Sequence, residues 1–156
     1  MSRPVSDVLS HLGEVPDSIA DLPLSKAANA FVTDLYHVLQ AWDDFYDGDQ
    51  MPQSAKLEAI WASLVGIPSN PFFRAHYGEL LPLMASLVVK WESANQLEAK
   101  RERLDIAFVW RAAFFDVVLH CLLIEHGPCI AMEQGPRVAR LYSETFDSFR
   151  KEFEHA

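Results

Sequence analysis

The sequence is poor in cysteine and in basic residues, and no stretch of it has the alternating pattern of a strand. Cys121 and Cys129 are the only cysteines, and Cys121 lies within a long apolar stretch. We therefore expect two free thiols in a reducing compartment. The first residues lack the apolar core of a secretory signal, which predicts a cytoplasmic protein.

Basic residues number 13 against 22 acidic ones, which gives a formal net charge of −9. This balance disfavours direct binding to nucleic acid and to anionic membranes. No glycine-rich phosphate loop, zinc-type Cys/His spacing or Ser-His-Asp arrangement can be identified. An acidic protein can still bind other proteins, including those that normally hold nucleic acid, by imitating phosphates.

The apolar residues recur at three- and four-residue steps, so we predict an all-α fold. A proline-punctuated lead-in over residues 1–24, with one short helix over Val5–Leu12, is expected to precede a single domain over 25–156. That domain is predicted to be a compact bundle of five or six helices around a buried central helix, at about 103–126. Arg111, Asp116 and His120 interrupt this apolar stretch, so we expect a core helix and not a membrane span.

The remaining helices follow from start and stop signals. Ser25 is predicted to cap a helix that ends at Gly48, and a second helix is expected from about Met51 to Gly66. A long helix is expected at 79–100, then a short turn at 129–134 and a last helix after Pro136. The apolar stripe of the second helix (Leu57, Ile60, Trp61, Leu64) and all four tryptophans (Trp42, Trp61, Trp91, Trp110) are predicted to be buried.

Three carboxylates, Asp43, Asp44 and Asp47, fall in the last turn of the first helix, with no lysine or arginine in that turn. Unpaired carbonyls already make a helix C-terminus partly negative, so acids there need a cation or solvent. The first and last carboxylates share one helix face, while Asp44 is expected to be exposed. A divalent metal, a buried arginine and solvent are all open as the compensating partner.

This D-D-x-x-D pattern resembles the first aspartate-rich motif of class I isoprenoid synthases, which are all-helical enzymes that hold a prenyl diphosphate through magnesium. The resemblance implies that Asp43 and Asp47 are magnesium ligands, with Asn95 and Glu98 standing in for the second motif. The family's N-D-x-x-S-x-x-x-E pattern is absent from this chain. Separately, Glu102-Arg103-Leu104-Asp105 is similar to the E-x-x-D half of the all-helical nucleotide pyrophosphohydrolases.

A second resemblance covers more of the chain and carries no established function. Four blocks are similar to segments of small helical proteins of tailed phages: 42–49, Asn70-Pro71-Phe72-Phe73, 91–98 and 106–111. This similarity implies a phage-encoded protein that is expressed in the host cytoplasm.

Arg111 and His120 are the remaining candidates for chemistry. An arginine within an apolar helix must pair, because an isolated buried charge costs several kcal/mol. We expect a buried ion pair of Arg111 with Asp43 and Asp47, with bidentate phosphate binding as the functional alternative. His120 lies one turn after Asp116 and is either a base that this carboxylate orients or a satisfied core histidine.

Two function classes follow from these observations. The first is a small acidic helical protein of the phage type that binds a protein partner as an inhibitor, a host-takeover factor or an assembly factor. The second is a magnesium-dependent helical enzyme, or enzyme remnant, that acts on a diphosphate. Whether the protein forms homo-oligomers is left open.

The enzyme class predicts that Mg²⁺ together with a diphosphate raises the melting temperature. A ligand that binds only the native state, at a hundredfold excess over its Kd, stabilises it by about 2.7 kcal/mol. Asp43→Asn should abolish this increment, whereas Asp44→Ala should retain it. Differential scanning fluorimetry measures the shift, and an unchanged melting temperature with both metal and diphosphate counts against the enzyme class.

Overall fold

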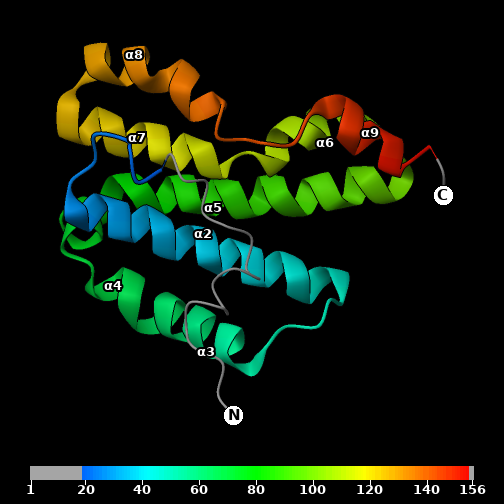
Figure 1. The fold of residues 1–156 in the computed structure, drawn as a ribbon, viewed down its shortest axis with the longest axis horizontal. Helices are drawn as coiled ribbons and strands as arrows, with labels where there is room; N and C mark the ends of the chain where they lie inside the picture. Colours follow the sequence, from blue (N-terminus) through cyan, green and yellow to red (C-terminus); the bar gives the residue numbers. More distant parts are fainter. Residues whose placement is uncertain (1–18, 155–156) are drawn as a thin grey trace. The chain divides into compact units, whose positions relative to one another are not determined.

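The computed structural model describes residues 19–154, and their regular secondary structure is entirely helical, which confirms the all-α prediction. Figure 1 shows the order of the elements. The predicted helix over Val5–Leu12 lies outside the described residues. The helices are α2 (Lys26–Asp47), α3 (Gln53–Trp61), the π-helix η1 (Ala62–Gly66), α4 (Ile67–Ser69), α5 (Pro71–Lys100), α6 (Leu104–Arg111), α7 (Phe114–His126), α8 (Pro128–Ala139) and α9 (Phe146–Glu152).

The chain groups into two compact units, one up to His76 and one from Tyr77 onward, where the sequence pattern predicted a single domain from residue 25. The division falls within α5. His76 has non-helical backbone angles there, with φ −126° and ψ 17°. Gly78 and Pro82 follow closely; glycine weakens a helix, and Pro82 cannot donate the next hydrogen bond to the preceding turn. The helix predicted at 79–100 therefore begins earlier and contains a break.

Helix α2 has the ends that its sequence predicts. The Ser25 hydroxyl accepts a hydrogen bond from the Ala28 N–H at 3.2 Å. Gly48 adopts a left-handed conformation (φ 76°), and its N–H bonds the carbonyls of the last turn. The buried face of α2 comprises Ala28, Phe31, Val32, Leu35 and Ala41. Trp42, which was predicted to be buried, is 50% exposed, and Tyr46, one turn further along the helix, is 49% exposed.

Helix α3 and η1 pack against α2, and the buried side chains that they contribute are alanines, Ala55 and Ala62. Because a helix buries only one face, this arrangement turns the larger residues outward. The stripe that was predicted to be buried is exposed: Leu57 57%, Ile60 56%, Trp61 65% and Leu64 72%. The burial predicted for this stripe, and for Trp42 and Trp61, is therefore wrong.

An aromatic cluster and one buried amide connect the start of α5 to α2 in the first unit. The Phe31 ring lies 5.4 Å from that of Phe73 and 6.2 Å from that of Phe72, centroid to centroid. Asn70 is 8% exposed, and its Nδ2 donates to the Ala27 carbonyl at 2.9 Å. Its Oδ1 accepts from the Phe73 N–H at 3.0 Å, which caps α5 just before Pro71.

In the second unit, the central helix predicted over 103–126 is two helices, α6 and α7, which meet at a bend of 45°. At the bend, the N–H groups of Ala112 and Ala113 bond carbonyls three residues back, and such bonds tighten and redirect the chain. Neither glycine nor proline marks this place in the sequence. Among the described residues, no single helix has the length and apolar character of a membrane span; only α6 and α7 counted together across the bend meet that criterion.

The C-terminal part also differs from its prediction. Residues 129–134, which were predicted to form a turn, belong to α8. The single last helix that was predicted after Pro136 is instead the end of α8 followed by α9, with the non-helical segment Tyr142–Thr145 between them. Helix α8 packs on α7 and α9 packs on α6. Phe149 of α9 forms a buried cluster with Ala94 of α5 and Ala107 of α6. Cys121 is buried and Cys129 exposed, and both are free, as predicted; burial raises the pKa of the Cys121 thiol to about 12.

We predict that Asn70→Ala lowers the free energy of unfolding by about 2 kcal/mol, because it removes a helix cap and leaves a carbonyl without its donor. Asn70→Asp also loses the donor to Ala27 but retains the acceptor for the Phe73 N–H, so the difference between the two variants isolates the helix cap. Ser69→Ala, at an exposed neighbouring position, should stay within about 0.5 kcal/mol. Urea unfolding measures all three, and equal stabilities for Asn70→Ala and Ser69→Ala would contradict the prediction.

Candidate functional site

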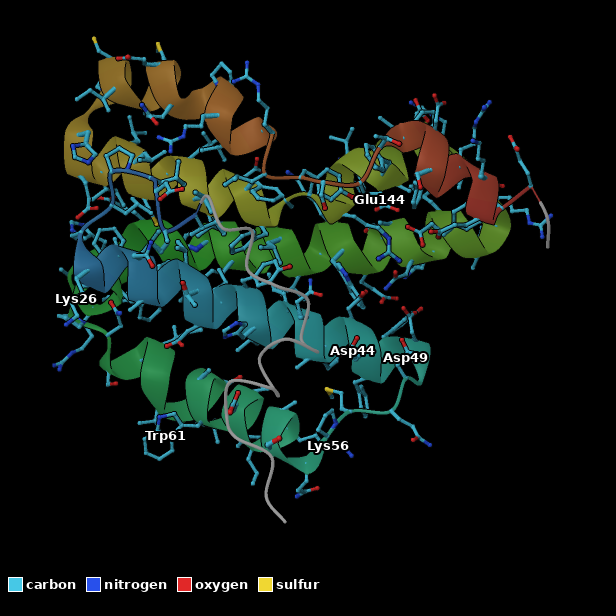
Figure 2. All side chains as sticks on the ribbon, in the orientation of Figure 1. Lys26, Asp44, Asp49, Lys56, Trp61 and Glu144 are labelled. Carbon is cyan, nitrogen blue, oxygen red and sulfur yellow. The ribbon has the colours of Figure 1, made fainter. Side chains whose placement is uncertain are left out.

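The acidic end of α2 combines half-buried and exposed carboxylates. Asp43 and Asp44 are half-buried, whereas Asp47 and Asp49 are exposed. Figure 2 labels Asp44 and Asp49 at this end of the helix. Asp44, predicted to be exposed, has a pKa above its ordinary value because burial disfavours its charged form and because Asp49 and Asp47 add negative charge. Asp44, Asp47 and Asp49 are thus close enough at the helix end to act on one another, while the sharing of one helix face by Asp43 and Asp47 stays a prediction.

The predicted magnesium ligands come from both units: Asp43 and Asp47 from the first, Asn95 and Glu98 from the second. Within residues 19–154 no group of three or more His, Cys, Asp or Glu side chains is arranged to hold a metal ion. The magnesium site, and the ion pair of Arg111 with Asp43 and Asp47, stay predictions.

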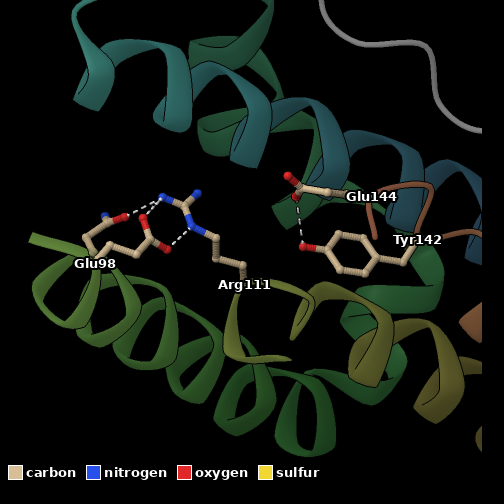
Figure 3. Close-up of polar contacts among 5 residues, drawn as sticks. Glu98, Arg111, Tyr142 and Glu144 are labelled. Atoms are coloured by element: carbon tan, nitrogen blue, oxygen red, sulfur yellow. Dashed lines mark hydrogen bonds and ion pairs between the residues drawn. The ribbon is translucent and has the colours of Figure 1, made fainter. Parts of the chain in front are cut away.

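In the second unit, Arg111 at the end of α6 binds the polar end of α5 (Figure 3). Its Nη2 donates to Glu98 Oε2 at 2.7 Å and to Asn95 Oδ1 at 2.9 Å, and its Nε donates to Glu98 Oε1. The side chains of Arg111 and Glu98 are 21% and 12% exposed. This bidentate pairing neutralises the Glu98 carboxylate inside the fold, a partner that the sequence analysis did not assign to Arg111.

This pairing explains why polar residues follow the buried apolar residues near the end of α5. Leu87 and Ala94 are buried on α5, and Asn95 is only 4% exposed. Asn95 and Glu98 thus occupy core positions where they serve as acceptors for a guanidinium. The Asn95 Nδ2 atom is buried and has no hydrogen-bond partner within the described residues. Glu102, one turn beyond Glu98, is exposed, in agreement with a helix that leaves the core there.

Tyr142 and Glu144 form a second polar contact of this unit, drawn with the first in Figure 3. The Tyr142 hydroxyl donates to Glu144 Oε2 at 3.3 Å. Burial raises the pKa of the Tyr142 hydroxyl and of the Glu144 carboxyl. The positive charge of Arg111 lowers both pKa values, and the negative charge of Glu98 raises both. These two residues lie in the segment that was predicted to be part of a continuous last helix, so the sequence pattern did not single them out.

The other candidate groups have partners that differ from the predicted ones. Asp116 accepts a hydrogen bond from Lys90 Nζ at 3.3 Å, while His120 Nε2 lies 3.7 Å from Glu79 Oε2. The orientation of His120 by Asp116, one of two interpretations of this pair, thus has no support among the described contacts. Glu102 lies in the turn before α6, and Asp105 within α6 pairs with Arg103. The E-x-x-D match therefore does not place two carboxylates on one helix face.

The most unusual feature of the first unit is an exposed apolar row on α3 and η1. We call Leu57, Ile60, Trp61 and Leu64 the outer seam. Their spacing of three, one and three residues puts them on one helix face. Figure 2 shows Trp61 projecting from α3 into open space. Apolar patches of this kind are uncommon on monomeric proteins and typically mark binding surfaces.

Two hollows border the outer seam, and Ile60 lines both. We call the first, of about 630 Å³, the acidic hollow; it is lined by Asp34, His37, Leu57, Glu58, Ile60, Trp61 and Ala62. We call the second, of about 610 Å³, the apolar hollow; it is lined by Val38, Ala41, Trp42, Phe45, Met51, Lys56, Ala59, Ile60, Ser63 and Leu64. Glu58 and Lys56 are on different sides of the helix, so the hollows flank the seam with different chemistry.

Sequence reasoning identified the residues of the outer seam but assigned them to the core. The available signal was the presence of two separate apolar stripes on this helix. Ala55, Ala59 and Ala62 form one stripe and the large residues form another. When both stripes are apolar, the spacing does not decide which one faces the neighbouring helix.

Comparison with family models, curated proteins and solved structures found no match to this chain. Its function is therefore argued from its own residues.

We predict a strong coupling between Arg111 and Glu98. Arg111→Met should lower the free energy of unfolding by about 3 kcal/mol, because it leaves Glu98 buried without its cation. The double variant Arg111→Met/Glu98→Gln should recover much of this loss, which a double-mutant cycle measures. As a control, Lys90→Met removes a cation from a solvent-exposed pair with Asp116 and should cost less than about 1 kcal/mol. Additive effects of the two Arg111–Glu98 substitutions would refute the pairing.

Proposed function

We propose that this chain is a small acidic helical protein of the tailed-phage type, which acts in the host cytoplasm by binding a protein partner. Its role is that of an inhibitor, a host-takeover factor or an assembly factor. The observation that carries the proposal is the outer seam, four large apolar side chains that are each more than half exposed. Full burial of a fully exposed side chain of this size is worth about 1.5–3 kcal/mol, and each of these partly exposed side chains gains the fraction that corresponds to its exposed area.

The surroundings of the seam support a specific interface. Trp42 and Phe45 are 50% and 69% exposed, line the apolar hollow, and have ring centroids 5.9 Å apart. Tryptophan and other aromatic residues are enriched at the centres of protein interfaces because they bury a large area at low entropic cost. An apolar centre with polar flanks is the usual anatomy of a protein-binding surface.

The charge of the chain favours a protein over a nucleic acid or a membrane. Described residues of the first unit include seven acidic and three basic side chains. Phosphate backbones and anionic lipids carry the same sign and are repelled. A protein with basic residues around an apolar patch is attracted instead, and the attraction speeds their association.

The magnesium-enzyme alternative has less support. Two of its four proposed ligands, Asn95 and Glu98, hold the Arg111 guanidinium. A metal ion at that position has to displace a buried, bidentate cation, which leaves Arg111 without these acceptors.

Site-specific cross-linking tests the proposal. A photo-reactive amino acid at position 61 should cross-link a defined protein from bacterial host cells, whereas the same group at the exposed position 89 of α5 should not. With that partner purified, Leu64→Ser should weaken binding about tenfold or more, because a central apolar contact is lost.

The matched control is Val89→Ser, which alters a similarly exposed apolar residue outside the seam and should bind like the wild type. Both variants should keep the stability of the wild type within about 0.5 kcal/mol, since both side chains are largely exposed. Equal cross-linking from positions 61 and 89, or unchanged binding by Leu64→Ser, would refute the proposal.

A further inference from the structure

The flanks of the outer seam differ in charge, which restricts what can dock on it. Asp34 and Glu58 line the acidic hollow on one side. On the other side the apolar hollow contains Lys56 as its charged residue. A partner that covers the seam therefore meets carboxylates along one flank and aromatic rings along the other.

Asp34 has an unusual environment for a carboxylate. It is half-buried and makes no hydrogen bond or ion pair with the described residues. A Cβ atom on Gly66 would lie 2.8 Å from its Oδ2, so the absent side chain of η1 makes room for the carboxylate. Burial raises the pKa of Asp34, while His37 on the same helix lowers it. A carboxylate in such a position gains from an incoming cation.

We propose, on the basis of the proposed function above, that the outer seam binds an α-helix of a partner protein that carries lysine or arginine along one flank, with a basic side chain paired to Asp34. The four seam residues have the spacing at which two helices interdigitate, and residues beside such a seam select partners by charge. Asp34 and Glu58 are placed to make that selection.

A second copy of this chain in antiparallel orientation fits the surface less well. A two-fold contact pairs identical patches. In an antiparallel contact between two seams, the acidic hollow of one copy faces the acidic hollow of the other, so carboxylates meet carboxylates. The excess of acidic residues in this unit adds to the repulsion. The charge of the surface thus favours a basic partner.

Three short stapled helices with the same apolar seam test the proposal, with Lys, Gln or Glu along one flank. Fluorescence polarisation of each labelled helix against the full-length protein measures its Kd at low and high salt. The Lys helix should bind most tightly and the Glu helix least, and high salt should reduce the difference. Asp34→Asn should weaken binding of the Lys helix about fivefold and leave binding of the Gln helix unchanged.

Asp21→Asn is the matched control, because it removes one negative charge from an exposed residue that lines neither hollow. It should leave the Kd of the Lys helix unchanged. The unliganded Asp34→Asn protein should be at least as heat-stable as the wild type, since burial disfavours the charged form of Asp34. A loss of stability would make Asp34 a structural residue and overturn its assignment.

The outcomes separate this inference from the proposed function. Equal binding of all three helices, or equal effects of Asp34→Asn and Asp21→Asn, overturns the charge selectivity and leaves an apolar docking surface. No helix binding, together with a seam-dependent cross-link to a host protein, overturns the helical partner alone. If sedimentation analysis finds a dimer and Leu64→Ser dissociates it, a second copy of the chain occupies the outer seam, and the inference is overturned. Equal cross-linking from positions 61 and 89 overturns both the inference and the proposed function.

Discussion

The packing of α3 and η1 on α2 through alanine side chains is the constraint from which the surface of the first unit follows. Ala55 and Ala62 are buried, and small side chains let two helices approach closely. A helix has one face toward its neighbour, so the large residues of α3 are turned away from it. The outer seam is thus the necessary counterpart of an alanine interface. Among residues 19–76, no helix covers Leu57, Ile60, Trp61 or Leu64.

The second unit solves a different physical problem, the burial of a guanidinium. Arg111 lies at the end of an apolar helix, and an unpaired charge there is costly. Asn95 and Glu98 supply acceptors from positions on α5 that follow apolar, buried ones. The polar interruption of that stripe, which suggests metal ligands when the sequence is considered alone, has a structural explanation in this contact. Polar residues at core positions are thus not by themselves evidence of catalysis.

The two features have different implications for function. The Arg111 guanidinium and the Glu98 carboxylate pair with each other within their own unit, which is typical of groups that maintain the fold. The outer seam and Asp34 lack such contacts among the described residues. Exposed apolar area and a half-buried carboxylate without a hydrogen bond or ion pair to the described residues each lower the stability or solubility of an isolated protein. A partner that covers both removes these costs, which is the physical basis for proposing a binding surface in the first unit.

The sequence by itself determined the helical class, the ends of α2 and the state of the cysteines. These depend on local chemistry: apolar spacing, a serine cap, a left-handed glycine and the burial of Cys121 in an apolar segment. It also marked Arg111 as a residue that must pair. The sequence does not reveal the bend between α6 and α7, because Ala112 and Ala113 are residues that favour a helix. It does not reveal the break at His76 either, because Pro82 lies six residues beyond it. Only the tertiary structure decided which apolar stripe of α3 is buried and which acceptors within its own unit Arg111 binds. Helical periodicity specifies which residues share a face, but the face that packs inward depends on the shape of the neighbouring helix.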